Sequence, residues 1–308
     1  MTLYDVCIIG AGPAGMTAAI YAARAQLSVL LLEASVPGGK VVLTSEVENW
    51  PGRSHISGPD LARELFEHVQ NYDIAYVNTP VTSLESRGEV KRIHCGDELY
   101  EARCLILASG TLERKLGIPG EKEGYGQGVS YCAVCDGAFF RGQEVAVIGG
   151  GNSAFEDAVY LTRFAKQVHL FTRRDQARAD KTNQKRLLEN ERVIWHKNYS
   201  PTEIVLDAEG YVTGLKLRST AGQEDLELAC MAVFPMVGLD ANTAFVDCPE
   251  ILDKEGFVLV DSDCRTTVPG LFAAGDVCAK SLRQIVTASS DGAIAAQAAV
   301  HYLEAQEG

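Results

Sequence analysis

Two stretches of the chain repeat one pattern of apolar and polar positions. Residues 4–33, YDVCIIGAGPAGMTAAIYAARAQLSVLLLE, run from a short apolar segment through a glycine-rich turn and an alanine-rich segment to a second apolar segment. Residues 143–174, QEVAVIGGGNSAFEDAVYLTRFAKQVHLFTRR, repeat this order. Short apolar runs bounded by glycine indicate buried strands, and the longer stretch between them indicates a helix. The pattern therefore predicts two βαβ units with parallel sheets in an α/β protein.

Two turn-rich segments flank the second unit. They are ASGTLERKLGIPG at 108–120 and FPMVGLDANTAF at 234–245. Glycine, proline and small polar residues mark loops, so we expect the chain to cross between domains at these places. Farther on, TTVPGLFAAGDV at 266–277 predicts an apolar strand that ends in a Gly-Asp turn, and the alanine-dense segment 289–303 predicts a helix.

Composition narrows the possible partners and the compartment. The 308 residues carry a formal net charge of −13, which disfavours binding to nucleic acid or to an anionic membrane. No apolar run approaches the roughly 18 residues of a transmembrane helix, and no basic segment precedes an apolar one at the N-terminus as in a signal peptide. The nine cysteines are odd in number and scattered, which argues against a disulfide framework. We therefore expect a protein of a reducing, cytoplasmic compartment without a membrane segment.

The first glycine-rich turn fits a dinucleotide. Gly10, Gly12 and Gly15 form G-x-G-x-x-G between the predicted strand and helix. The first glycine permits a tight turn, the second lets the backbone approach a pyrophosphate, and the third lets the helix pack on the strand. N–H groups at the helix start would bind phosphate, and Glu33, at the end of the second strand, would accept hydrogen bonds from ribose hydroxyls. An acid at this place suits FAD or NAD.

The second glycine-rich turn differs where the ribose should lie. Gly149, Gly151 and Ala154 form the G-x-G-x-x-A variant. Its second strand ends in arginines, at 173, 174 and 178, instead of an acid. Guanidinium groups bind a 2′-phosphate through charge-assisted bonds, which favours NADPH over NADH. The alternative is an ordinary solvated arginine cluster.

A pair of cysteines lies just before the second unit. Cys132 and Cys135 form a C-x-x-C followed by Asp136. Zinc usually takes four ligands, and the chain has no second C-x-x-C, so a metal site is disfavoured. The remaining interpretations are two buried thiols or a redox dithiol, with Asp136 as a turn residue in the first and a proton donor in the second. Phe139 and Phe140 are expected in the core; the alternative is an aromatic patch beside the dithiol that a protein partner could dock on. We also expect the other cysteines (7, 95, 104, 230, 248, 264 and 278) and His169 to be buried.

Two nucleotide sites of opposite charge and a dithiol in one chain indicate an electron relay from NADPH through FAD to the two sulfurs. With these features, the chain resembles the low-molecular-weight bacterial thioredoxin reductases from end to end. The resemblance rests on motifs in the family's order: IIGAGPAGMTAAIYAARA, SEVENWPG, CAVCDGAFF, VIGGGNSA, TRRDQARA, PGLFAAGDV and RQIVTASSDGAIAA.

The resemblance implies two Rossmann-like, three-layer domains. Residues 1–113 and 241–308 would form a discontinuous FAD domain, and residues 114–240 an inserted NADPH domain that carries the cysteine pair. It also implies a homodimer that reduces the disulfide of thioredoxin, with a nucleotide domain that rotates between two poses.

The resemblance also implies the site residues. FAD would be held by Gly10, Gly12, Pro13, Ala14, Gly15, Glu33, Gly38, Gly39, Lys40, Asn49, Asp276, Arg283, Gln284 and Ile285. NADPH would be held by Gly151, Asn152, Ser153, Arg173, Arg174 and Arg178. In the family the second cysteine, here Cys135, faces the flavin, the first, here Cys132, attacks the substrate, and the acid after them, here Asp136, donates a proton.

Three positions depart from the family pattern. Lys40 stands where the family usually has glutamine, which brings a cation toward the flavin. Thr172 replaces the usual histidine before the arginine pair, and Ala138 stands where some members carry phenylalanine.

Three other functions remain open on the sequence. A dithiol oxidase of this fold would not need the arginine cluster, and a ferredoxin-dependent reductase would not need an intact second nucleotide motif. A non-catalytic flavoprotein that senses redox state would not need the dithiol with its neighbouring acid.

Overall fold

The chain forms two compact units in the computed structural model, which describes residues 2–44 and 47–307 and only the backbone at Cys135 and Glu307. The first unit comprises Met1–Leu112 and Asp240–Gly308, and the second comprises Glu113–Leu239. The predicted boundaries differ from these by one residue at each crossing. The crossing strands β7 (Thr111–Glu113) and β15 (Leu239–Ala241) pair with each other.

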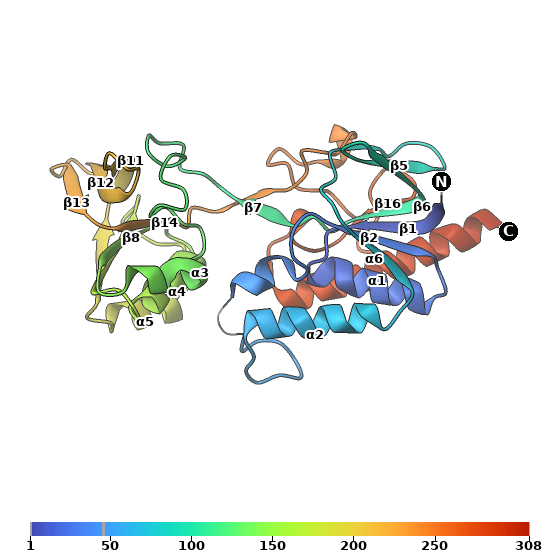
Figure 1. The fold of residues 1–308 in the computed structure, drawn as a ribbon, viewed down its shortest axis with the longest axis horizontal. Coiled ribbons are helices and arrows are strands. Elements are labelled where there is room, and N and C mark those ends of the chain that lie inside the picture. Colours follow the sequence, from blue (N-terminus) through green and yellow to red (C-terminus); the bar gives the residue numbers. More distant parts are fainter. Residues whose placement is uncertain (1, 45–46, 308) are drawn as a thin grey trace. The chain divides into compact units, whose positions relative to one another are not determined.

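The first unit is built on a seven-stranded sheet in the order β3-β2-β1-β6-β5-β4, with β16 also paired to β6 (Figure 1). Its elements are β1 (Leu3–Ile9), α1 (Pro13–Arg24), β2 (Val29–Glu33), α2 (Gly58–Gln70), β3 (Ile74–Asn78), β4 (Ser83–Glu85), β5 (Lys91–Cys95), β6 (Glu98–Leu107), β16 (Leu271–Ala273) and α6 (Ile285–Glu307). Strands β3, β2, β1, β6 and β16 are parallel to one another, whereas β5 pairs antiparallel with both β6 and β4.

The apolar strands are explained by burial on both faces of this sheet. Along β1, Val6 and Ile8 pack with α1 and α6, and Cys7 and Ile9 pack on the opposite face against β5 and the segment that leads to β16. A strand covered on both sides needs apolar side chains at every position, which is why the run is continuous instead of alternating.

The second unit has a parallel sheet in the order β10-β9-β8-β14. Its elements are α3 (Ala133–Asp136), β8 (Glu144–Ile148), α4 (Asn152–Leu161), β9 (Gln167–Thr172), α5 (Lys181–Leu188), β10 (Val193–Lys197), β11 (Tyr199–Leu206), β12 (Val212–Ser219), β13 (Leu226–Ala229) and β14 (Ala232–Pro235). The antiparallel sheet β11-β12-β13 covers one face, and α4 with its neighbouring helices covers the other. Each unit is thus three-layered, and the predicted α/β fold with two parallel sheets is confirmed.

The last helix is longer than predicted. The sequence indicated 289–303, but α6 begins at Ile285. The Thr287 hydroxyl accepts a hydrogen bond from the N–H of Gln284 at 3.1 Å, and the N–H of Ala288 donates to the Gln284 carbonyl at 2.9 Å. The helix therefore starts with the β-branched run Ile285, Val286 and Thr287, which has a lower helix propensity than the alanine-rich segment after it. No helix among the described residues is long and apolar enough to cross a bilayer.

Candidate functional site

The glycine-rich loop of the first unit is tightly packed except at its centre. Gly10 has a φ of 106°, and a Cβ there would lie 2.4 Å from the Ala108 carbonyl oxygen. A Cβ on Gly15 would lie 1.8 Å from the Gly10 carbonyl oxygen. At Gly12, in contrast, a Cβ would meet nothing within 4 Å, and no side chain caps the helix that begins after it. The loop therefore leaves open space in front of the unpaired N–H groups of α1, as an approaching phosphate requires.

Two other segments close onto this loop. The N–H of Gly38 donates to the Ala11 carbonyl at 2.7 Å, and a Cβ on Gly39 would lie 3.2 Å from the Gly12 Cα. A Cβ on Gly275 would lie 2.8 Å from that of Ala14. The predicted residues around Gly38 and Asp276, far apart in sequence, are thus brought to one place.

Asp276 lies in a cationic surrounding. Its Oδ1 is buried and has no hydrogen-bond partner among the described residues. Burial raises the pKa of this carboxyl, while the charges of Arg283, Lys280 and Lys40 act to lower it. A buried acceptor without a donor is rare in folded proteins, so the atom is suited to a ligand hydroxyl.

A second carboxylate, not predicted from the sequence, holds the turn that carries Asp276. Asp291 Oδ2 accepts the N–H of Gly275 at 2.9 Å and pairs with the ammonium group of Lys280. Lys280 and Asp291 were not predicted, because no motif spacing marks them in the sequence. Their only signal was the occurrence of charge within a segment that is otherwise apolar and small.

The predicted residues beside this turn have different roles in the structure. Asn49 Nδ2 donates to Gln284 Oε1 at 2.9 Å, so these two residues are brought together. The guanidinium of Arg283 donates to the carbonyls of Asp276, Lys280 and Cys278, each at 3.2 Å, and therefore fixes the loop. Ile285 packs against the small cluster around Val41, Val47, Leu61 and Ala62.

Glu33 ends β2 beside the glycine-rich loop. Its Oε2 accepts the N–H of Ala11 at 2.7 Å, and its Oε1 accepts the N–H of Ser35 at 2.9 Å. Each carboxylate oxygen has a second lone pair that can accept a hydroxyl. The acid is therefore held at the loop with capacity left for a ribose.

The second unit repeats the loop geometry. A Cβ on Gly149 would lie 2.2 Å from the Met236 carbonyl oxygen, whereas one on Gly151 would meet nothing within 4 Å. Gly151 caps α4 without a side-chain hydrogen bond. The N–H of Arg178 donates to the Gly150 carbonyl at 2.7 Å, which folds the segment after β9 back onto the loop.

The three arginines of this segment are exposed. Thr172, which replaces the family's histidine, is buried, donates to the Arg174 carbonyl at 3.0 Å and accepts from the Trp195 indole at 3.0 Å. It therefore orders the turn between β9 and the arginines. Asn152 lies at the start of α4 and accepts the N–H of Asp180 at 2.8 Å; Ser153 beside it is exposed.

The cysteine pair lies on a short helix of the second unit. Cys132 is half-buried, disulfide-bonded and directly precedes α3. The backbone of Cys135 lies in α3, but its side chain is outside the described part of the chain. Asp136 is half-buried, and its N–H donates to the Cys132 carbonyl at 3.2 Å. A Cβ on Gly137 would lie 2.8 Å from Leu161, so the segment after α3 packs against α4.

The prediction that Phe139 belongs to the core is wrong. Its side chain is 80% exposed, next to the cysteine segment, because the turn after α3 directs it outward. Phe140 is half-buried and packs edge-on against Phe234, with ring centroids 6.0 Å apart. Ala138, the third departure, is exposed as well.

The other buried residues agree with the sequence analysis. Seven cysteines, at 7, 95, 104, 230, 248, 264 and 278, are free and buried, and His169 is buried. Burial raises the pKa of Cys230, Cys264 and Cys278 to about 12, so these thiols stay protonated and unreactive at neutral pH. Within residues 2–44 and 47–307, no group of three or more His, Cys, Asp or Glu could hold a metal ion.

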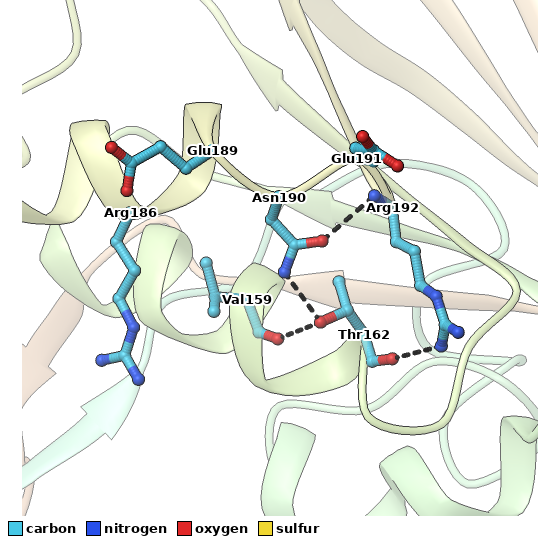
Figure 2. A pocket seen from close by; sticks show the side chains of 7 residues that line it. All are labelled: Val159, Thr162, Arg186, Glu189, Asn190, Glu191 and Arg192. Atoms are coloured by element: carbon cyan, nitrogen blue, oxygen red, sulfur yellow. Dashed lines mark hydrogen bonds between the residues drawn. The ribbon is translucent and has the colours of Figure 1, made fainter.

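A depression of about 490 Å³ in the second unit contains none of the predicted residues. Figure 2 shows Thr162 at the centre of a hydrogen-bond network in this depression. Its hydroxyl donates to the Val159 carbonyl and accepts from the Asn190 side-chain amide, and its carbonyl accepts from the Arg192 guanidinium. Arg186 points away from this network (Figure 2). These contacts tie the end of α4 to the segment before β10, so the depression has a structural explanation.

Comparisons with known proteins agree with this architecture. Residues 4–292 match the family model described as pyridine nucleotide-disulphide oxidoreductase. The chain is 48% identical to the thioredoxin reductase of Listeria monocytogenes, over 98% of this chain and 94% of that protein. It is 45% identical to the thioredoxin reductase of Bacillus subtilis, over 98% and 95%. The crystal structure of Lactococcus lactis thioredoxin reductase superimposes with a TM-score of 0.94 at 44% identity and covers 98% of this chain and 99% of that one.

Fold, loops and comparisons together define an oxidoreductase, of a family that implies a flavin and a pyridine nucleotide. The chain belongs to the pyridine nucleotide-disulphide oxidoreductase family, among the low-molecular-weight thioredoxin reductases. The family resemblance stated from the sequence is thereby confirmed.

Proposed function

We propose that this enzyme uses NADPH and FAD to reduce the disulfide of thioredoxin through Cys132 and Cys135. One observation carries the proposal: a single chain holds two open glycine-rich loops, one flanked by an acid and the other by arginines, together with a C-x-x-C. Opposite charges at the two ribose positions favour two different nucleotides.

The first unit is suited to FAD. The open face at Gly12 and the N-terminus of α1 would receive the pyrophosphate, Glu33 the ribose, and the buried Oδ1 of Asp276 a hydroxyl of the ribityl chain. Lys40, Lys280 and Arg283 supply positive charge there. FAD, when bound, supplies two-electron transfer between the hydride of NADPH and a disulfide.

The second unit is suited to NADPH. The open face at Gly151 and the start of α4 would receive its pyrophosphate, with Asn152 and Ser153 in the first turn. The arginines at 173, 174 and 178 would bind the 2′-phosphate, because planar guanidinium groups form paired bonds to phosphate oxygens.

The dithiol step balances as two exchanges. The thiolate of Cys132 attacks one sulfur of the thioredoxin disulfide; a mixed disulfide forms, and the other sulfur leaves as a thiolate that takes up a proton. The thiolate of Cys135 then attacks the Cys132 sulfur, which closes the enzyme disulfide and releases the second thioredoxin thiol. The Cys132 and Cys135 thiols each lose a proton on becoming thiolates, and Asp136 takes up each of these protons in turn and passes it to the leaving sulfur. Thioredoxin gains two electrons and two protons, and NADPH provides the electrons for the next cycle.

Surface features support a protein substrate and a homodimer. Phe139, 80% exposed and four residues after Cys135 in the chain, gives an apolar contact for a docking partner. Tyr21 on α1 and Val286 on α6 are 48% and 42% exposed, which suits an interface between two copies of the first unit. Seven free cysteines favour a reducing compartment, here the cytoplasm.

The rival functions are less well supported. A ferredoxin-dependent reductase or a dithiol oxidase leaves the arginine cluster and the open second loop without a use. A non-catalytic redox sensor leaves the disulfide-bonded cysteine and its neighbouring acid without a use.

An anaerobic titration tests the proposal. NADPH is added to the purified yellow protein while the flavin absorbance is recorded, NADH is used in parallel, and thioredoxin is added afterwards. We expect NADPH to bleach the flavin far more effectively than NADH, and oxidised thioredoxin to restore the colour. Failure of NADPH to bleach the flavin would reject the proposal, and bleaching without thioredoxin reduction would indicate another acceptor.

Substitution of one cysteine tests the dithiol step. In Cys135→Ser the resolving thiol is missing, so we expect flavin reduction by NADPH to persist and catalytic reduction of thioredoxin to be lost. Retained turnover would show that the cysteine pair is not the relay.

A further inference from the structure

A buried carboxylate lies close to the cysteine segment within the second unit. Glu121 is 5% exposed. Its Oε1 accepts the N–H of Leu116 at 2.7 Å and the phenol of Tyr131 at 2.6 Å, and its Oε2 accepts the N–H of Gly117 at 2.7 Å. Three donors to one buried anion are charge-assisted hydrogen bonds, the strong class in proteins. Glu121 thus ties the start of the second unit to the residue before Cys132.

Tyr131 is held from two sides. Burial, together with the hydrogen bond and charge of Glu121, raises the pKa of its phenol, so the hydroxyl remains a donor over the whole neutral range. The ammonium group of Lys115 lies 3.5 Å from the centroid of its ring and 5.7 Å from that of Tyr125. A cation over an aromatic face is attractive, so the ring is fixed as well as the hydroxyl.

The backbone on either side of Tyr131 is also fixed. The Ser130 hydroxyl accepts the N–H of Cys132 at 3.0 Å and donates to its carbonyl at 3.2 Å. The N–H of Ser130 itself donates to the Val233 carbonyl in β14 at 3.1 Å. The chain therefore enters Cys132 from a segment with little rotational freedom.

We propose that Glu121 and Tyr131 are positioning residues that orient Cys132 for its attack on a protein disulfide. The inference rests on the proposed function, because it assigns the attack to Cys132. Both residues act through the backbone: their phenol–carboxylate bond fixes the segment from which the Cys132 side chain projects. Attack on a disulfide needs the thiolate aligned with the sulfur–sulfur bond, so a small misorientation of the attacking residue lowers the rate steeply.

Tyr131→Phe removes only the phenol hydroxyl and keeps the ring under Lys115. Glu121→Gln keeps the size but loses the charge and places an amide donor among three donors. The matched control is Tyr199→Phe, which removes another hydrogen-bonded phenol of the second unit: Tyr199 is half-buried, and its hydroxyl donates to the Glu224 carbonyl at 3.2 Å.

Four measurements are made on the intact, flavin-loaded enzyme. They are the thermal unfolding midpoint, the rate of flavin bleaching by NADPH, kcat and KM for thioredoxin, and the rate at which iodoacetamide alkylates Cys132 in the reduced enzyme between pH 6 and 9, followed by peptide mass spectrometry. For Tyr131→Phe we expect unchanged bleaching and an unchanged KM. We expect kcat for thioredoxin to fall about tenfold, with a shifted pH profile of alkylation.

Each outcome bears on the proposal. Unchanged kcat and an unchanged alkylation profile in Tyr131→Phe would overturn it, as would an equal fall in Tyr199→Phe. A fall in thermal stability and in flavin bleaching together, without a separate loss in the thioredoxin step, would assign the pair a purely structural role and also overturn it. If Glu121→Gln does not fold, Tyr131→Phe decides alone. If the wild-type enzyme does not reduce thioredoxin, the proposed function fails, while the alkylation profiles still test the positioning of Cys132.

Discussion

The two glycine-rich loops of this chain have the same backbone connections and opposite surroundings. In each, the first glycine donates to the carbonyl at the end of the second strand: Gly10 to Leu32 at 2.7 Å and Gly149 to Phe171 at 3.0 Å. In each, the next residue accepts an N–H from a returning segment, Ala11 from Gly38 and Gly150 from Arg178, both at 2.7 Å.

The returning segments make the difference between the loops. In the first unit the segment follows Glu33, whose carboxylate binds the Ala11 N–H, and it brings Lys40 toward Asp276. In the second unit it brings exposed arginines. The same backbone geometry thus suits two different ligands. The two loops differ in the charged side chains that the segment after the second strand places beside them.

The largest expected effect on the free energy of unfolding comes from substitution at the last position of the glycine-rich motifs, Gly15 in the first and Ala154 in the second. Gly15→Ala would place a Cβ 1.8 Å from the Gly10 carbonyl oxygen, so the loop must shift; we expect a loss of more than about 3 kcal/mol in the free energy of unfolding and loss of bound flavin. Ala154→Gly, its counterpart, should cost only about 1 kcal/mol, because it changes helix propensity. Denaturation with guanidinium chloride, together with the flavin content, measures both. Equal effects at the two positions would show that the loops do not differ in packing.

The arginine cluster gives the next effect. Replacing the arginines at 173, 174 and 178 by alanine should lower kcat/KM for NADPH about 100-fold and leave that for NADH nearly unchanged, because only the 2′-phosphate loses its partners. Arg186→Ala removes an exposed arginine of the same unit at the separate depression (Figure 2). It should leave the ratio of kcat/KM for NADPH to kcat/KM for NADH unchanged. An unchanged ratio of these two kcat/KM values in the triple variant would refute the assignment of the arginines to the 2′-phosphate.

The smallest expected effect is a dependence of stability on pH that is confined to the second unit. His169 Nδ1 and His196 Nε2 lie 3.0 Å apart in the second unit, and burial, then the neighbouring His169 charge, lowers the pKa of His196 to about 4. The unfolded chain takes up this proton near pH 6.5, whereas the folded chain takes it up only near pH 4. The free energy of unfolding is therefore highest above pH 6.5 and falls by about 1 kcal/mol as the pH drops toward 4.

Trp195 fluorescence in a Trp50→Phe background reports unfolding of the second unit, since each unit has one of the chain's two tryptophans. His196→Gln should remove the added acid sensitivity, whereas His68→Gln, at an exposed position on α2, should retain it. An identical pH profile in His196→Gln and the wild type would contradict the assignment to the histidine pair.

The sequence by itself determined the two βαβ units, the place of each glycine-rich loop and the opposite charges after the second strands. These features depend on neighbours a few residues apart: the period of apolar positions, the glycines that a tight turn requires, and the residue that follows a strand. The same local logic located the C-x-x-C and the buried cysteines.

Only the tertiary structure decided which distant residues meet. Asp276, whose buried Oδ1 has no hydrogen-bond partner within the described part of the chain, lies by the first loop because β16 pairs with β6 and α6 packs on α1, where a Cβ on Gly292 would lie 2.1 Å from the Ala14 carbonyl oxygen. The exposure of Phe139 depends on the turn after α3. The contact of Glu121 with Tyr131 depends on how two irregular segments fold against the antiparallel sheet and β14. Such contacts leave no periodic trace in the sequence, because they arise from long-range packing instead of from local spacing.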